Sequence, residues 1–105
     1  FLIFTLPLSS FSAEILQINS PDTLTIGDNN RSYTIHIACI EVEPSKESIA
    51  LKWLKKELPR RTKVNLKPIG SNEGVLVANV IKIKSKTDIG KSMFLEGIGE
   101  FSCFN

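Results

Sequence analysis

Residues 22–40 read DTLTIGDNNRSYTIHIACI, and this stretch decides the fold class. Residues 22–26 alternate polar and apolar side chains, and so does the run 31–40. A period of two is typical of strands that bury one face. Residues 27–30 between them are Gly, Asp, Asn and Asn, which tolerate positive φ and mark a turn. The stretch therefore predicts a β-hairpin.

Alternation also predicts which side chains share a face on these strands. In the run 31–40, residues 33, 35, 37 and 39 should point one way and residues 34, 36, 38 and 40 the other. Upstream, the apolar-rich run 13–18 ends near Pro21, which removes a backbone donor. A short strand followed by a bend is expected there.

A helix is expected directly after the hairpin. Ser45 is a favourable N-cap, and Pro59 ends the pattern because proline cannot continue a helix. Between them, apolar residues recur at helical spacing and predict one buried stripe. Its expected members are Ile49, Ala50, Trp53, Leu54 and Leu58.

The remainder of the chain predicts two more strands and a second short helix. The strands are expected at 63–68 and 75–84, around a turn at 70–74. The helix should start at Thr87 or Asp88 and end at Gly97. Its expected inward residues are Ile89, Met93 and Phe94. Five short strands with an interposed helix predict a mainly β (α+β) fold, a five-stranded OB-type barrel with two short helices.

The start of the chain differs in composition from the rest. Residues 1–12 carry no charge and are typical of the apolar region of a truncated secretory signal peptide, with cleavage expected after Ser12. Residues 13–105 then form one domain, periplasmic or secreted. The alternative is a tail or strand that packs on the domain. The segment is too short to cross a bilayer.

Two cysteines, Cys39 and Cys103, fit an exported protein with one disulfide. The alternative is a pair of buried thiols.

The charge of +2 is unevenly distributed. Residues 46–91 hold twelve Lys or Arg against four acids, and the remaining residues hold one Arg against seven acids. A basic half of this kind can attract phosphate-rich partners, so nucleic acid and a protein are equally candidate partners, and the alternative is a set of merely solvated helix and strand faces. The candidate nucleic-acid-binding residues are Lys52, Lys55, Lys56, Arg60, Arg61, Lys82 and Lys84.

Four segments, in this order, resemble the staphylococcal nuclease-like (thermonuclease) family. Residues 20–24 (SPDTL) look like its Asp-Gly-Asp-Thr-Val, and residues 36–41 (HIACIE) look like its Arg-Leu-x-Gly-Ile-Asp. Residues 48–54 resemble its Glu-Ala-x-x-Phe-Leu helix, and residues 88–99 resemble its closing segment. The resemblance covers almost the whole chain after residue 12. It implies the barrel of that family and a site for calcium-assisted phosphodiester hydrolysis.

The resemblance also implies where the reactive groups lie. Asp22 and Glu41 fall at metal-ligand positions, since hard cations such as Ca²⁺ prefer carboxylates. His36 falls at the position of the first arginine. Glu43, one residue from the position of the catalytic glutamate, is the candidate general base. His36 and Glu43 are therefore the candidate catalytic residues.

Several parts of that site are replaced in this chain. Ser20 stands for the first carboxylate, Pro44 for the catalytic glutamate and Val75 for the second arginine. The imidazole of His36 lacks the planar, always-charged guanidinium fork of arginine. Loss of one such group commonly slows catalysis by about 10²- to 10³-fold. The interpretation is a degenerate site on a non-catalytic binding module without a cofactor; the alternative is a divergent nuclease that retains Ca²⁺.

Overall fold

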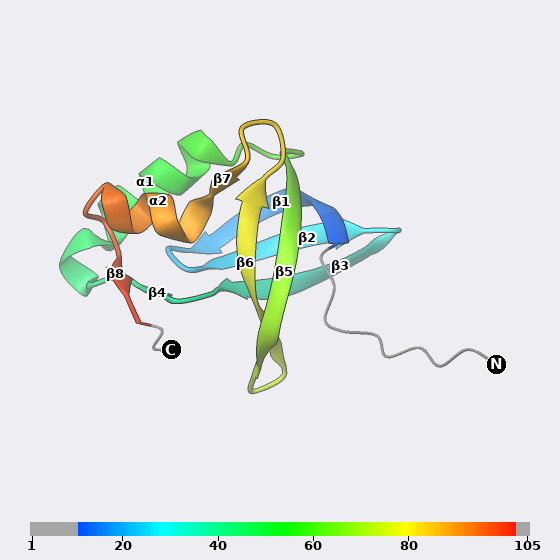
Figure 1. Ribbon diagram of the computed structural model, residues 1–105, viewed down its shortest axis with the longest axis horizontal. Helices are drawn as coiled ribbons and strands as arrows, with labels where there is room; N and C mark the ends of the chain where they lie inside the picture. Colours follow the sequence, from blue (N-terminus) through cyan, green and yellow to red (C-terminus); the bar gives the residue numbers. More distant parts are fainter. Residues whose placement is uncertain (1–10, 103–105) are drawn as a thin grey trace.

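The computed structural model describes residues 11–102 as strands and helices joined by short turns (Figure 1). In chain order the elements are β1 (Phe11–Ser20), β2 (Thr23–Asp28), β3 (Arg31–Ile37), β4 (Ile40–Glu41), η1 (Pro44–Lys46), α1 (Glu47–Glu57), β5 (Lys63–Asn72), β6 (Val75–Lys82), β7 (Thr87–Asp88), α2 (Ile89–Leu95) and β8 (Glu100–Phe101). No helix in this part of the chain is long and apolar enough to span a membrane.

A parallel pairing between β3 and β6 closes the main sheet into a barrel. The sheet has the order β3-β2-β1-β5-β6-β7, and its other neighbours are antiparallel. Ile35, His36 and Ile37 of β3 pair with residues 76–78 of β6. The fold is therefore mainly β, with a closed five-stranded barrel and two short helices, and it is consistent with an OB-type barrel.

The first strand extends further in both directions than the sequence predicted. β1 covers Phe11–Ser20, whereas the expected run was 13–18. Phe11 and Ser12 pair with Leu66 and Asn65 of β5. The expected cleavage position after Ser12 thus lies within a paired strand. Residues 1–10, which make up most of the predicted signal peptide, lie outside the described residues.

The β2–β3 hairpin is confirmed, but its turn is shorter than expected. Asn29 and Asn30 form the turn, with φ of 51° and 66°. Two left-handed residues match the twist of the flanking strands in a two-residue hairpin. Gly27 belongs to β2, where a Cβ would come within 3.1 Å of the Leu16 side chain. The absence of a side chain at Gly27 therefore allows β1 and β2 to pack closely together at this point.

The prediction of one continuous strand over 31–40 is wrong at its end. β3 stops at Ile37, and Cys39 has φ of 66°, in the left-handed region. The chain turns there and resumes as β4 at Ile40. Ala38 and Ile40 are both buried, so they do not form the expected second face opposite Ile37.

Helix α1 covers one side of the barrel, as the sequence predicted, but two details differ. Lys46 occupies the N-cap without a side-chain hydrogen bond, because the 3-10 turn η1 takes up the expected cap Ser45. Ile49 is 58% exposed. The helix instead buries Ala50 and Leu54, with Trp53 half-buried and Leu58 buried just after the helix.

Helix α2 begins and ends as predicted. Asp88 caps its start by accepting a hydrogen bond from the Lys91 backbone N–H, 3.1 Å long. At the other end, Gly97 N–H donates to Phe94 O and Ile98 N–H to Met93 O. With φ of 77° at Gly97, this pair of bonds is a Schellman motif. Phe94 is 50% exposed, so its predicted inward position is wrong.

The core lies between the barrel strands and the two helices. Its largest fully buried side chains are aliphatic, and the described residues bury no polar or charged side chain. Leu54 of α1 and Met93 of α2 both belong to this one cluster, which continues into the barrel. The helices therefore supply part of the core that the strands leave open. The barrel members include Ile15, Leu24, Ile26, Ile35, Ile37, Val64, Leu66 and Val80.

We expect Leu54→Ala to lower the free energy of unfolding by about 2–5 kcal/mol, because it leaves a cavity in a fully buried position. Urea denaturation measures the change. Lys52→Ala on the same helix is the control and should change stability by less than about 0.5 kcal/mol, since Lys52 is exposed. Equal effects of the two substitutions would contradict the packing of α1 on the barrel.

Candidate functional site

A pocket lined by carboxylates lies where strands β4 and β8 meet the β1–β2 turn. It has a volume of about 320 Å³ and is lined by Asp22, Glu41, Val42, Glu43 and Glu100. Asp22 lies in the turn between β1 and β2, and Glu41 ends β4. The structure thus gathers the two predicted metal ligands and one predicted catalytic residue around one cavity.

Glu100 is the member of this pocket that the sequence did not reveal. It reaches the site because β8 pairs with β4 and places Glu100 opposite Glu41. Glu41 and Glu100, which are far apart in sequence, meet through this pairing. Like charges directly opposite on neighbouring strands repel each other and lower stability.

Glu41 and Glu43 would face opposite sides only if the strand continued beyond Glu41. β4 ends at Glu41, however, and the chain then enters η1 at Pro44. Both side chains line the same pocket. The change of backbone conformation after Glu41 removes the alternation that would have separated them.

The carboxylate of Asp22 is already held by neighbouring side chains. Its Oδ1 accepts hydrogen bonds from the hydroxyls of Ser20 and Thr23, each 3.0 Å long. Its Oδ2 lies 3.8 Å from His36 Nε2. His36 reaches it because Thr23 of β2 pairs with His36 of β3. The hydroxyls of Ser20 and Thr23 thus orient the Asp22 carboxylate.

The donor set does not fit a preformed calcium site. Within residues 11–102, no group of three or more His, Cys, Asp or Glu side chains is arranged to hold a metal ion. Calcium takes six to eight oxygen ligands, and one oxygen of Asp22 is already shared by two hydroxyl donors. Asp22 and Glu41 are near each other but are not arranged around one ion.

Pro44 and Val75, at which the sequence predicted the loss of catalytic groups, add no positive charge to this pocket. Pro44 begins η1 and is exposed, and Val75 begins β6, where it is half-buried. Among residues 11–102, His36 is the one residue with a basic side chain in an ion-pair contact with the pocket carboxylate Asp22. A developing charge on a phosphate would therefore meet carboxylates without an arginine clamp.

A basic surface, formed by Lys52, Lys55, Lys56 and Arg60, occupies the second half of α1 and the loop after it. These four side chains are exposed. Among the described residues none of them forms an ion pair with an acid. Lys55 and Arg60 also line a second pocket of about 330 Å³ whose other walls are residues 15–18 of β1 with Leu58 and Pro59.

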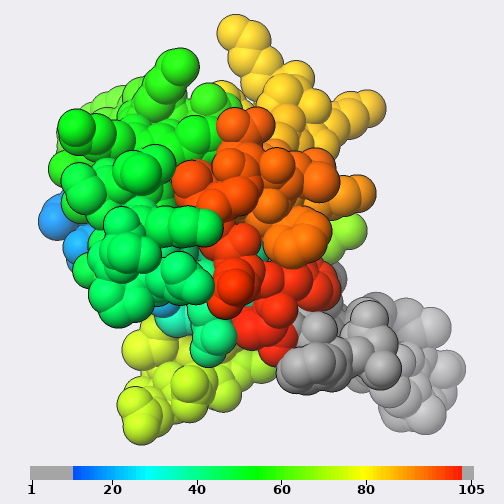
Figure 2. All heavy atoms as spheres, turned by 90° about the vertical axis from the view of Figure 1, so that its left-hand side faces the viewer, coloured from blue at the N-terminus to red at the C-terminus, as the bar shows by residue number. Residues whose placement is uncertain are grey.

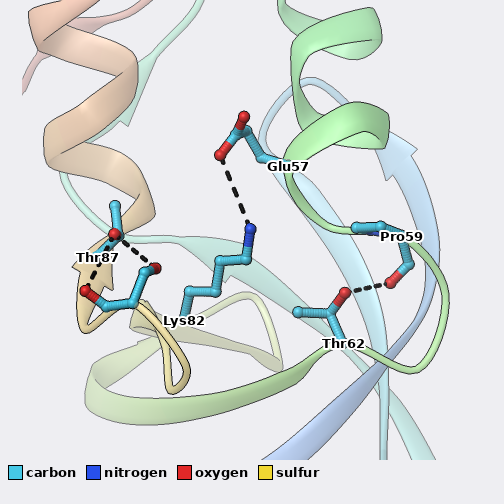
Figure 3. Close-up of polar contacts among 6 residues, drawn as sticks. Glu57, Pro59, Thr62, Lys82 and Thr87 are labelled. Carbon is cyan, nitrogen blue, oxygen red and sulfur yellow. Dashed lines mark hydrogen bonds and ion pairs between the residues drawn. The ribbon is translucent and has the colours of Figure 1, made fainter.

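The loop that carries Arg60 is held by hydrogen bonds to backbone carbonyl oxygens. Thr62 donates to Pro59 O through both its hydroxyl, at 2.6 Å, and its backbone N–H, at 3.0 Å (Figure 3). The Arg61 N–H donates to Ile15 O at 2.6 Å. The loop therefore holds Arg60 at a defined place beside β1.

Two of the other predicted binding residues are already engaged by acids. Lys82 Nζ lies 3.9 Å from Glu57 Oε1, an ion pair that joins β6 to the end of α1 (Figure 3). Arg61 lies 3.7 Å from Glu14, which also accepts a 2.8 Å hydrogen bond from Lys63. These cations stabilise contacts between elements, so they are less available to a ligand than the basic surface.

The last predicted binding residue, Lys84, is exposed in the turn between β6 and β7. Hydroxyls of Ser85 and Thr87, 2.7 Å apart, hold this turn (Figure 3). The turn projects at the same end of the barrel as the loop after α1 (Figure 1). Lys84 thus lies at that end without belonging to α1.

Cys39 is disulfide-bonded. Its predicted partner Cys103 lies outside the described residues.

No family model and no curated protein matches the chain.

The ion pairs of Glu14 predict a pH dependence of stability. The hydrogen bond from Lys63, the charge of Lys63 and then the charges of Arg61 and Arg60 lower the pKa of Glu14 below 4.5. A lowered carboxyl pKa stabilises the fold above the unfolded value, and this contribution is lost as pH falls through the folded one. Glu14→Gln should therefore destabilise the protein slightly at pH 7.

The difference between wild type and Glu14→Gln should shrink as the pH falls below 4.5. Thermal denaturation over a pH series measures it, with Glu73→Gln, an exposed acid in the β5–β6 turn, as control. A difference that stays constant down to strongly acidic pH would show that Glu14 acts through packing rather than charge.

Proposed function

We propose that the chain is a non-catalytic binding module on a divergent staphylococcal nuclease-like barrel, and that it binds nucleic acid through the basic surface. The observation that carries the proposal is the placement of four exposed cations, none of which forms an ion pair within residues 11–102, on one helix end and a fixed loop. Carboxylates, which repel phosphate, gather in a different pocket that shares no lining residue with it.

Phosphate contacts are the interaction that this surface favours. Lys55 and Arg60 line the same pocket, where Gln17 of β1 adds an amide that can donate to a phosphate or sugar oxygen. Salt-dependent release of counterions would supply most of the affinity. Trp53, the aromatic residue of α1, is half-buried in the core and is not free to stack with bases. The expected binding is therefore weakly dependent on sequence.

Cleavage is not expected, because the groups that would stabilise charge on a phosphate are absent from the acidic pocket. Asp22 is engaged by Ser20, Thr23 and His36, and the described residues place no arginine among the lining residues. Proximity of carboxylates alone leaves the transition state without compensation of its negative charge.

We expect the full chain to bind a fluorescent DNA duplex and an RNA of the same length with affinity that falls steeply with salt. The variant with Lys55, Lys56 and Arg60 all changed to Gln should lower the slope of log K against log salt by about one per lost phosphate contact. Lys67→Gln, an exposed residue on β5, is the control. Absence of salt dependence, or an equal effect of the control, would refute the proposal.

Incubation of the full chain with DNA or RNA and calcium should give no cleavage above the protein-free background. The Asp22→Ala variant is the matched control, because it removes the carboxylate at the predicted metal position. Gel electrophoresis of end-labelled substrates detects single cuts. Robust cleavage that disappears in Asp22→Ala would instead establish a divergent nuclease.

A further inference from the structure

An exposed apolar surface covers the end of α2 and the strand β8. Its members are Phe94, Leu95 and Phe101, with exposed fractions of 50%, 69% and 56%. The rings of Phe94 and Phe101 meet edge to face at 6.1 Å. Three large apolar side chains gathered in this way mark an interaction surface more often than scattered single ones do.

This apolar surface lies beside the edge of a short strand. Within residues 11–102, β8 pairs with β4 alone, so its other edge has no partner strand there. Figure 2 looks onto this side of the molecule, where α2 and β8 form a continuous area next to α1. An added strand on such an edge gains backbone hydrogen bonds, and its side chains alternate between the two faces.

The two faces of the β4–β8 ribbon differ in chemistry. Phe101 pairs with Ile40, and its ring contacts Phe94 on the α2 side. One residue away, Glu100 pairs with Glu41 and faces the carboxylate pocket. A strand added beside β8 would thus present every second side chain to aromatic rings and the others to carboxylates.

We propose that the free edge of β8 binds an extended segment of a partner protein in which basic and apolar residues alternate. Basic side chains of the partner would lie against Glu41 and Glu100, whose mutual repulsion they relieve. Its apolar side chains would cover Phe94 and Phe101. This surface is separate from the basic surface. It would bind a cationic partner, whereas the basic surface would bind an anionic one.

Charge decides among the three candidate occupants. A second copy that paired its β8 with this one would add another glutamate to the carboxylates. The chain's own residues 1–10 are apolar but carry no positive charge, so they would leave Glu41 and Glu100 unpaired. A cationic partner segment satisfies both faces of the ribbon.

The test uses the full chain and a labelled synthetic peptide of about ten residues in which Lys and Val alternate. Fluorescence anisotropy measures binding, and a peptide of the same composition with Lys and Val in separate blocks is the matched control. The alternating peptide should bind at least about tenfold more tightly, since only it can satisfy both faces at once. Equal affinities, or no binding of the alternating peptide, would overturn the proposal.

Two variants link the binding to this surface. Phe101→Ser and Glu100→Gln should each weaken binding of the alternating peptide about tenfold. Ile83→Ser and Glu73→Gln, which change an exposed apolar residue and an exposed acid elsewhere, should leave it unchanged. Glu100→Gln should also raise the melting temperature, because it removes a like-charge pair. Weaker binding together with a higher melting temperature excludes misfolding as the cause.

Two further results would assign the surface to another occupant. Self-association in sedimentation that is lost in Phe101→Ser would assign it to a second copy. An increase of peptide affinity in Phe4→Ser would assign it to residues 1–10 of the same chain. Either result overturns the proposal of a cationic partner and leaves the nucleic-acid assay of the basic surface unaffected.

Discussion

The parallel pairing of β3 with β6 is the contact on which the rest of the fold depends. It joins strands that are distant in sequence, and it turns an open meander into a barrel whose interior holds Ile35, Ile37 and Ala78. The Ala38 N–H donates to Ala78 O just beyond the ladder, so closure also sets where the chain leaves the barrel. The carboxylate pocket includes residues 41–43, just after this exit, and the pocket beside α1 is lined by residues 15–18 of β1.

Local signals predicted the β2–β3 hairpin and the two helices because each signal acts within a few residues. Paired asparagines at 29 and 30 define a hairpin, and Gly97 defines the end of α2. Side chains at the rim of the core were harder to predict. Ile49 and Phe94 fit a buried pattern by periodicity, but both side chains are exposed. Periodicity indicates which face of a helix is apolar, whereas the width of the neighbouring surface determines how much of it is buried.

The candidate site was predictable in part for the same reason. Asp22 and Glu41 were singled out by the resemblance of residues 20–24 and 36–41 to known motifs, but Glu100 enters through the pairing of β4 with β8, which leaves no local mark in the sequence. The end of β4 at Glu41 brings Glu43 to the same side as Glu41. Among the predicted cations, the sequence did not distinguish Lys82 and Arg61, which hold acids, from those that remain exposed.

The core of the described residues contains no polar side chain, and this has a consequence for how such a domain changes over time. Every charged group discussed here lies at the surface, outside this hydrocarbon interior. Surface substitutions usually alter stability by less than about 0.5 kcal/mol. Ligand preference can therefore drift by single exchanges while the barrel continues to fold. An exposed position can lose or gain a chemical role without any compensating change inside the molecule, and new specificity can arise on the same framework.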